Sequence, residues 1–301
     1  MRRTLPRPVL ALLAPFALAA LLTGCGTAVL APGSFVAGGA RPALVVPPPD
    51  HDPTVPTPLL VVLHGYQSSA DQVEDLFPLA TAAEVLGVAV VRPQGAIDSL
   101  SRRFWNASEA CCNLYGFPVD DLGYLTRLID EIAQEMAVSE VMLFGHSNGG
   151  FMAYRLACEF PERFTAVVTI AGGLDTGPVP ACGAEGPARV LHVHGTEDRV
   201  IKYDGGSVSD LPLPFMPNDI PPYTGAEATI GAFASGAGCG PLVAGTPFDL
   251  DLRVDGAETV PLEASCPEGR RVALWRMVES GHEPRPGSGF AARVLWFALG
   301  W

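Results

Sequence analysis

The sequence predicts an α/β fold with a doubly wound, mostly parallel sheet, and three observations indicate it. Short apolar segments alternate along the chain with longer segments of helical periodicity. The short segments are apolar throughout, as expected for strands that helices cover on both faces. The chain has 301 residues, 48% of them hydrophobic and 17% charged, which suits one large domain with a substantial core.

The expected elements follow one another in order. Apolar runs predict strands over 41–46, 59–63, 88–91, 140–144, 165–170, 190–193 and 272–278. Helical periodicity covers 69–86, 120–136, 149–160 and 291–299, with Asp120 or Asp121 as a candidate cap of the second helix. The Pro- and Gly-rich segment 203–270 interrupts the alternation, so we expect it to form a cap or excursion with a strand pair at 248–254 and 258–262.

The N-terminus resembles a bacterial lipoprotein signal peptide, which we assign to residues 1–24. Three arginines precede an apolar stretch over 9–22 that is short for a membrane-spanning helix. Leu22-Thr23-Gly24-Cys25 then resembles a lipobox, in which the peptidase cuts before a lipidated cysteine. We therefore expect an exported protein that is anchored to a membrane of the cell envelope through Cys25.

The rest of the chain divides into a flexible tether over 25–40 and a catalytic domain over 41–301. An ordinary secretory signal cut nearby, for example after Ala31, would instead give a released, extracellular protein. The formal net charge of −13 and the lack of a basic stretch exclude a nucleic-acid partner.

Seven cysteines become six if Cys25 carries lipid. An even number in an oxidising compartment predicts three disulfides, with 15 possible connectivities, and buried free thiols are the alternative. Cys-x-x-Cys pairs and metal-type Cys/His spacings do not occur in the sequence, so no metal site is expected. The six candidates are Cys111, Cys112, Cys158, Cys182, Cys239 and Cys266.

The motif most informative about chemistry is Gly145-His146-Ser147-Asn148-Gly149, which lies between an apolar strand and a helical run. A Gly-x-Ser-x-Gly sequence in this setting is a nucleophile elbow, a turn so tight that only small residues fit on either side of the serine. We expect Ser147 to be the nucleophile of a hydrolase. A structural glycine-rich turn is the alternative.

A serine nucleophile needs a base and an acid that orients it. With this elbow the chain order is serine, acid, histidine, and His282 is the only histidine after residue 200. Asp198 follows the strand over 190–193 and is the expected acid. Asp175 is its competitor, and Glu197 and Asp204 are weaker candidates.

Two backbone N–H groups should form the oxyanion hole. One belongs to Asn148, directly after the nucleophile, and the other to Tyr66 in the loop after the strand over 59–63. In the loop over 94–118, Trp105 and Asn106 either line an acyl pocket with His146 or hold the loop by packing. His64 is expected to brace its loop, and His192 and His194 to pack or hydrogen-bond near buried strands.

At this point the chain resembles the secreted poly(3-hydroxybutyrate) depolymerase and feruloyl esterase family of α/β-hydrolases, over roughly residues 41–300. The matching motifs are Leu63-His64-Gly65, Arg92-Pro93-Gln94-Gly95, Trp105-Asn106-Ala107, Cys111-Cys112, Val119-Asp120-Asp121, Gly145-His146-Ser147-Asn148-Gly149-Gly150, Met152-Ala153-Tyr154-Arg155-Leu156-Ala157-Cys158 and His192-Val193-His194-Gly195-Thr196-Glu197-Asp198. The resemblance implies the α/β-hydrolase fold and the triad of Ser147, Asp198 and His282.

The resemblance also implies a pattern of disulfides. One of Cys111 and Cys112 would pair with Cys158 and the other with Cys182, and Cys239 would pair with Cys266. Two adjacent cysteines do not easily bridge to each other without distorting the peptide between them.

The chain departs from the family in two motifs. Tyr66 stands where the family often has a cysteine, and Glu283-Pro284-Arg285-Pro286-Gly287 follows His282 where the family usually has Thr-Trp-Pro-Gly. A polymer-binding module or Ser/Thr-rich linker does not follow the domain in this sequence, so soluble or short-chain esters are the expected substrates.

The expected function is that of an exported serine carboxylesterase that hydrolyses feruloyl-type, short-chain acyl or hydroxyalkanoate esters without a cofactor. Two alternatives remain open from the sequence. One is a serine peptidase or acyltransferase that uses the same triad. The other is a non-catalytic surface lipoprotein with a hydrolase-like domain.

Overall fold

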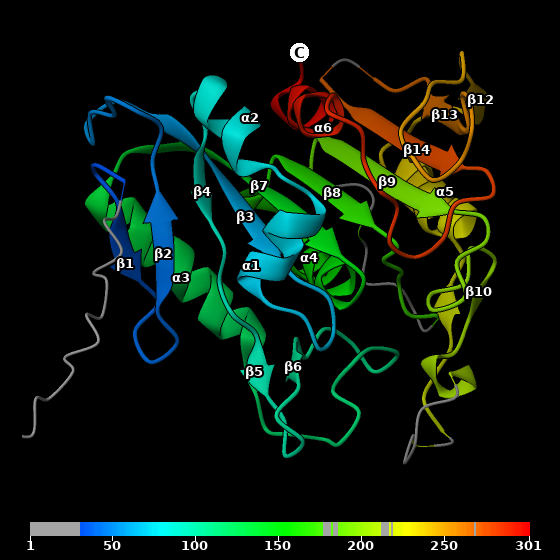
Figure 1. Ribbon diagram of the computed structural model, residues 1–301, viewed down its shortest axis with the longest axis horizontal. Coiled ribbons are helices and arrows are strands. Elements are labelled where there is room, and N and C mark those ends of the chain that lie inside the picture. The colour runs from blue at the N-terminus through cyan, green and yellow to red at the C-terminus, as the bar shows by residue number, and fades with distance from the viewer. Residues whose placement is uncertain (1–30, 177–181, 183–185, 212–216, 218, 268) are drawn as a thin grey trace, which may run out of the picture. The chain divides into compact units, whose positions relative to one another are not determined.

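A ten-stranded sheet forms the centre of the protein (Figure 1). The structure, a computed structural model, describes residues 31–176, 182, 186–211, 217, 219–267 and 269–301. The expected signal peptide and Cys25 therefore lie outside the described residues. Residues 31–301 make up one compact unit.

The sheet confirms the predicted mostly parallel architecture. Its six central strands, from β4 to β14, run parallel, and antiparallel strands complete both edges. In spatial order the strands are β1 (Phe35–Ala37), β2 (Ala43–Val46), β4 (Ala89–Val91), β3 (Thr57–Leu63), β7 (Val138–His146), β8 (Ala166–Ile170), β9 (Arg189–Gly195), β14 (Arg271–Met277), β13 (Thr259–Ala264) and β12 (Leu242–Ala244).

Helices cover both faces of this sheet. They are α1 (Ala70–Leu76), α2 (Ala80–Val85), α3 (Asp121–Glu135), α4 (Asn148–Glu159), α5 (Ala226–Gly236) and α6 (Phe290–Leu299). Two small ribbons lie in the loops, β5 (Ala96–Ile97) with β6 (Arg103–Phe104) and β10 (Gly205–Gly206) with β11 (Tyr223–Thr224). Short 3₁₀ turns occupy Pro161–Arg163 and Val208–Asp210.

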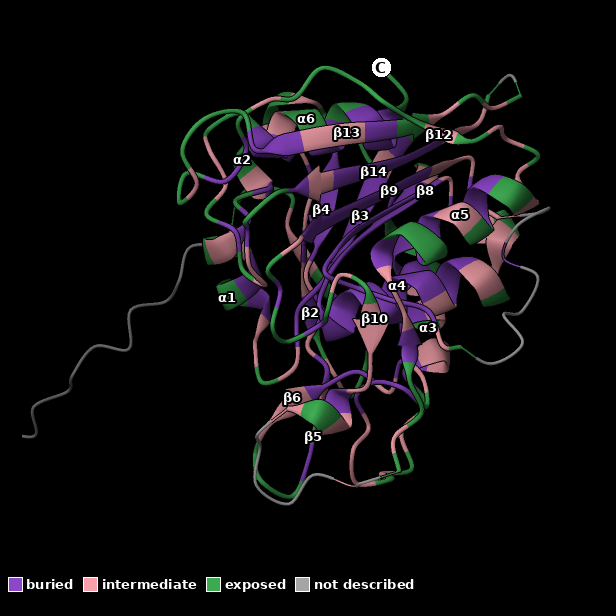
Figure 2. Cartoon of the chain, turned by 90° about the vertical axis from the view of Figure 1, so that its right-hand side faces the viewer, coloured by how far each residue is buried: buried purple, intermediate pink, exposed green. Residues whose placement is uncertain are grey.

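Alternate side chains of the central strands enter two separate cores. In β3, Leu59, Val61 and Leu63 pack with α3, α4 and α5, whereas Leu60 and Val62 pack with α1, α2 and α6. The two-residue period of a strand produces this division because successive side chains point to opposite faces. Figure 2 shows the central strands as a buried layer between the helices. A sheet buried on both faces leaves only its edges and strand ends to form a site.

Several segments differ from the sequence-based expectation. The predicted helix over 69–86 is two helices, α1 and α2, because Pro78 lies between them and cannot donate a helical hydrogen bond. Part of the expected tether forms β1, which pairs with β2. In the excursion, the strand expected over 248–254 is reduced to two isolated bridges, Phe248 with Thr259 and Asp251 with Pro286, and β13 pairs instead with β12.

The disulfides also differ from the pairing that the resemblance implies. Cys158 at the end of α4 pairs with Cys182, and Cys111 pairs with its neighbour Cys112. The peptide between these neighbours is cis. Because Cys182 lies within bonding distance of Cys158, Cys158 is paired without either Cys111 or Cys112. Cys239–Cys266 agrees with the expectation.

Among the described helices, all within residues 31–301, none combines the length and the apolar character needed to cross a bilayer.

Candidate functional site

Ser147 lies at the sharp turn between β7 and α4. Its backbone has φ 52° and ψ −121°, outside the conformations that most residues adopt. A Cβ atom on Gly145 would overlap the carbonyl oxygen of Gly149, and one on Gly149 would overlap the carbonyl oxygen of Leu63. Only glycine fits at both positions, so the turn has the close packing expected of a nucleophile elbow.

Asp198 and His282 meet at the same edge of the sheet, after β9 and β14. The Nδ1 atom of His282 lies 2.8 Å from Oδ2 of Asp198. The other carboxylate oxygen accepts hydrogen bonds from the backbone N–H groups of Val200 and Ile201, at 2.8 and 2.9 Å. His194 adds a further contact, with Nε2 3.2 Å from Oδ2. The carboxylate of Asp198 is buried and surrounded by donors.

The charge state of Asp198 follows from these contacts. Burial opposes ionisation, but the hydrogen bonds from His194 and His282 outweigh it and hold the pKa of the Asp198 carboxyl below its ordinary value. The carboxylate is therefore ionised at neutral pH. It accepts from Nδ1 of His282 and leaves Nε2 of that ring free to act as a base.

Two nearby histidines, His64 and His146, are neutral and contact backbone groups of neighbouring loops. Burial is the main cause that lowers the pKa of His146 to about 3, and the pKa of His64 falls to about 4 for the same reason. His146 lies 3.3 Å through Nε2 from the carbonyl oxygen of His282. His64 accepts from the N–H of Gly95 and donates to the carbonyl of Gly65, so it holds its own loop as the sequence indicates.

Two backbone amides lie next to Ser147. Asn148 follows it directly, and a Cβ on Gly65 would lie 3.3 Å from Cβ of Ser147, which places the Gly65–Tyr66 segment against the elbow. Within the described residues, the N–H groups of Tyr66 and Asn148 donate to no other protein group. Both are therefore available to a ligand.

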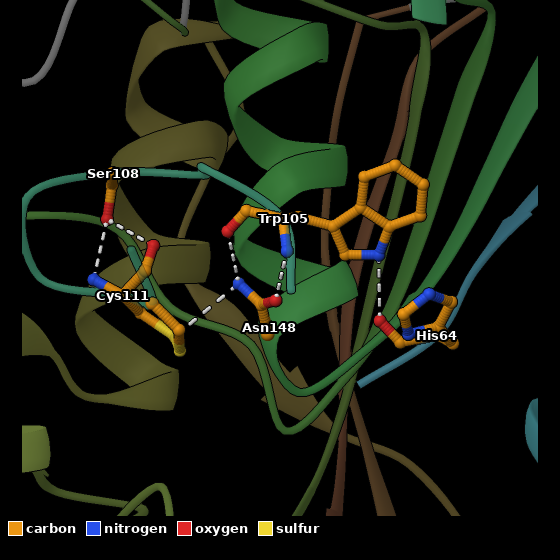
Figure 3. Close-up of a disulfide and its surroundings, with 6 residues drawn as sticks. His64, Trp105, Ser108, Cys111 and Asn148 are labelled. Atoms are coloured by element: carbon orange, nitrogen blue, oxygen red, sulfur yellow. Dashed lines mark hydrogen bonds between the residues drawn. A yellow bond between two sulfur atoms is a disulfide. The ribbon is translucent and has the colours of Figure 1, made fainter. Parts of the chain in front are cut away.

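Trp105 holds these two amide-bearing segments (Figure 3). Its indole N–H donates to the carbonyl oxygen of His64 at 3.0 Å, and its backbone N–H donates to Oδ1 of Asn148 at 2.7 Å. The side-chain amide of Asn148 returns a hydrogen bond to the Trp105 carbonyl and also contacts Sγ of Cys111. Trp105 is fully buried, so the alternative of loop packing fits its position and a pocket wall does not.

A cavity of about 640 Å³ opens over the elbow. Ser147, His146 and His282 line it together. The remaining lining mixes apolar and polar side chains: Tyr66, Leu76, Val200 and Leu211 with Gln67, Gln72, Asp75 and Glu283.

Asn106 lies elsewhere. It lines a different cavity of about 590 Å³ with Asp175 and Arg155. Its side-chain amide donates to the carbonyl of Val119, so it braces the long loop and does not line the cavity over Ser147. Asp175 forms a bridge with Tyr223 and has no described contact with His282, and Glu197 and Asp204 are exposed.

Sequence reasoning missed Asp251, which holds the loop that carries His282. Its carboxylate is buried and accepts from the hydroxyl of Ser280 and from the N–H of Arg285, on either side of His282. It also accepts from the N–H of Arg253 in its own turn. The signal in the sequence is weak, because an aspartate in a Pro- and Gly-rich segment usually marks an exposed turn.

In the described part of the chain, no group of three or more His, Cys, Asp or Glu side chains is arranged to hold a metal ion.

Comparisons with known proteins show that the chain is similar in sequence to proteins named esterases. It is 32% identical over 184 residues to the esterase NocK of Nocardia uniformis subsp. tsuyamanensis, covering 60% of this chain and 52% of the relative. It is 29% identical over 201 residues to feruloyl esterase C of Emericella nidulans, covering 64% of this chain and 65% of the relative. The chain thus spans between half and two thirds of these curated relatives. No family model matches it.

Solved structures share the architecture over most of the chain. The acetyl xylan esterase from Aspergillus awamori has a TM-score of 0.56 at 14% identity, covering 86% of this chain and 94% of that one. The Bacillus cereus carboxylesterase has a TM-score of 0.51 at 15% identity, covering 87% and 96%. Together with the parallel sheet and the elbow, these matches show that the chain has an α/β-hydrolase fold and is similar in sequence to esterases.

Proposed function

We propose that the protein is an exported serine carboxylesterase. The observation that carries the proposal is the hydrogen bond from His282 to the buried carboxylate of Asp198, together with the cavity that His282 lines with Ser147 at the elbow. This combination supplies a nucleophile, a base and an orienting acid from three strand ends. The similarity to esterases in sequence supports the same class of reaction.

The reaction follows from the roles of these groups. The hydroxyl of Ser147 attacks the ester carbonyl carbon while Nε2 of His282 takes its proton. The negative charge that forms on the carbonyl oxygen is stabilised by the amides of Tyr66 and Asn148. The tetrahedral intermediate expels the alcohol, which takes the proton from His282, and an acyl group remains on Ser147. Water activated by His282 then releases the acid.

The cavity supports small esters as substrates. Its volume suits an aryl or short-chain ester, and Tyr66, Leu76 and Leu211 offer apolar contacts to an acyl or aryl group. Feruloyl esterase C of Emericella nidulans is among the similar proteins, so hydroxycinnamoyl esters belong in the first set of substrates to test. The peptidase and acyltransferase alternatives use the same residues, and the acceptor of the acyl group distinguishes them.

We expect hydrolysis of methyl ferulate, p-nitrophenyl acetate or a hydroxybutyrate oligomer, with a burst from acyl-enzyme formation, and no cleavage of peptide amides. Ser147→Ala should lower kcat/KM by roughly 10⁴-fold or more, since the nucleophile is lost. Ser209→Ala is the matched control, because its hydroxyl bonds to Ser207 outside the cavity. A chain that neither hydrolyses any ester nor reacts with a fluorophosphonate at Ser147 would refute the proposal.

The acid can be identified with a pair of variants. Asp198→Asn should lower kcat by roughly 10³- to 10⁴-fold because an amide no longer holds the reactive tautomer of His282. Asp175→Asn should retain the activity, since Asp175 contacts neither Ser147 nor His282. Steady-state kinetics on one aryl ester measure both. Loss of activity in Asp175→Asn alone would move the assignment to that residue.

Asp251 should support both stability and turnover. Asp251→Ala leaves Ser280, Arg253 and Arg285 without their acceptor, so the free energy of unfolding should fall by about 2 to 4 kcal/mol. Because the loop carrying His282 loosens, kcat should fall as well. Urea denaturation and kinetics test this, with the exposed Asp255→Ala as control. A destabilised variant with full turnover would show that Asp251 does not position His282.

The export part of the proposal rests on the sequence of residues 1–25 and on the oxidised cysteine pairs. In cells fed a labelled fatty acid, the full chain should incorporate label and partition with membranes. Cys25→Ser should incorporate none. Label-free full chain recovered from the medium would instead indicate cleavage at another site and a released protein.

A further inference from the structure

A chain of buried hydrogen bonds leads from Asp198 through His194 and His192. Nε2 of His194 lies 2.8 Å from the carbonyl oxygen of Ile201 and 3.2 Å from Oδ2 of Asp198. Both partners are acceptors, so Nε2 carries a proton. Nδ1 of His194 lies 2.8 Å from Nε2 of His192. Both imidazoles are fully buried and belong to the C-terminal half of strand β9.

The far end of this chain meets two hydroxyl groups. Nδ1 of His192 lies 2.7 Å from the hydroxyl of Tyr154 on α4 and 2.9 Å from that of Thr169 on β8. Burial lowers the pKa of His192 well below its ordinary value, so this ring is neutral. A neutral ring has one donor and one acceptor nitrogen. The hydroxyl of Thr169 donates to that of Tyr154 at 2.8 Å, and the proton of Tyr154 has Nδ1 of His192 as its acceptor, so the proton of His192 lies on Nε2 and points at His194.

The direction of each hydrogen bond therefore agrees along the chain. A hydroxyl donates to His192, His192 donates to Nδ1 of His194, and His194 donates from Nε2 to Asp198. A second proton on His194 would need Nδ1, where the hydrogen of His192 already points. It would also place a cation among fully buried groups, which costs desolvation energy.

We propose that His194 is a positioning residue that acts through Asp198 as a neutral donor, and that His192 keeps it neutral. The proposal rests on the proposed esterase function and deepens it. Nε2 of His194 contacts Oδ2, and the backbone N–H groups of Val200 and Ile201 donate to Oδ1. The carboxylate therefore cannot rotate away from His282. As a neutral donor, His194 fixes the carboxylate without cancelling the charge that stabilises the imidazolium of His282.

The pH profile of kcat/KM reports this arrangement. The ionisable groups that face this chain of hydrogen bonds are His282 and Asp198, His146 on β7, Tyr154 on α4, and Tyr203 and Tyr223 from the loops after β9. Loss of the His194 donor leaves the charge on Asp198 less shared, so the imidazolium of His282 becomes more stable. The acid limb of the profile should then move to higher pH.

The kinetic test compares two substitutions at one position. His194→Phe should lower kcat roughly 10- to 100-fold, which corresponds to the loss of one hydrogen bond to a charged group, with little change in KM. It should also move the acid limb of the kcat/KM profile to higher pH. His194→Gln keeps an amide donor near the position of Nε2 and should recover most of kcat and the wild-type limb. Thr229→Val is the control, because it removes a buried hydrogen bond on α5, away from this chain.

A spectroscopic test does not depend on activity. In protein labelled with ¹⁵N-histidine, the nitrogen shifts of His194 should indicate a neutral ring protonated at Nε2 at the pH of the activity assay. The resonances are assigned by difference from the His192→Gln and His194→Gln variants. This measurement uses the wild-type chain and remains decisive if His194→Phe does not fold.

The outcomes separate the two proposals. A doubly protonated His194, or a folded His194→Phe with wild-type kcat and acid limb, overturns the role proposed for His194. A wild-type chain that hydrolyses no ester overturns the proposed function, while the nitrogen shifts still decide whether His194 is a neutral donor.

Discussion

The site depends above all on one buried ionised carboxylate. Asp198 accepts hydrogen bonds from its own loop, from His194 on β9 and from His282 in the loop after β14. A buried charge is tolerated only when its lone pairs are all used, so the carboxylate requires these segments to converge. The proposed base, His282, is oriented as a consequence of that requirement. The ends of β9 and β14 keep their spacing because the Asp198 carboxylate accepts hydrogen bonds from residues at both.

Close backbone contacts bring these strand ends together. A Cβ on Gly195 would overlap the carbonyl oxygen of Ser280, just as one on Gly149 would overlap that of Leu63. The N–H of Glu197 also donates to the Ser280 carbonyl at 2.9 Å. Glycine at the ends of β9 and at the elbow therefore allows neighbouring loops to approach within hydrogen-bond distance, and the side chains of Ser147 and His282 enter one cavity.

The local features of this fold were predictable from the sequence. The apolar runs of the central strands, the elbow around Ser147 and the order of Asp198 and His282 each involve a short pattern or a chain order. Features that depend on distant contacts were not predictable. Asp251 meets Ser280 across 29 positions between two irregular segments, and α5 lies in a Gly- and Ala-rich stretch with little periodicity. The packed position of Trp105 depends on tertiary contacts, because an indole in a loop is equally suited to a pocket wall.

The side chains of β3 are divided between two hydrophobic cores, and this division explains why the site lies at the strand ends. Leu59, Val61 and Leu63 serve one helical layer, and Leu60 and Val62 serve the other, so neither face has room for a ligand. The polar residues proposed for catalysis lie beyond the strands, whereas His192, His194 and Thr169 are buried within β9 and β8. Ser147, Asp198 and His282 each follow such a strand directly or within a few residues.

The contacts of Trp105 have a consequence for redesign of the long loop. One residue ties the carbonyl of His64 to the side chain of Asn148, so the segments that carry the Tyr66 and Asn148 amides are fastened to the same rigid ring and backbone. Grafting a different loop over 94–118 would change the spacing of those amides together with the shape of the surface around them. New specificities can therefore be introduced on either side of Trp105, but every grafted loop must retain the tryptophan at this position.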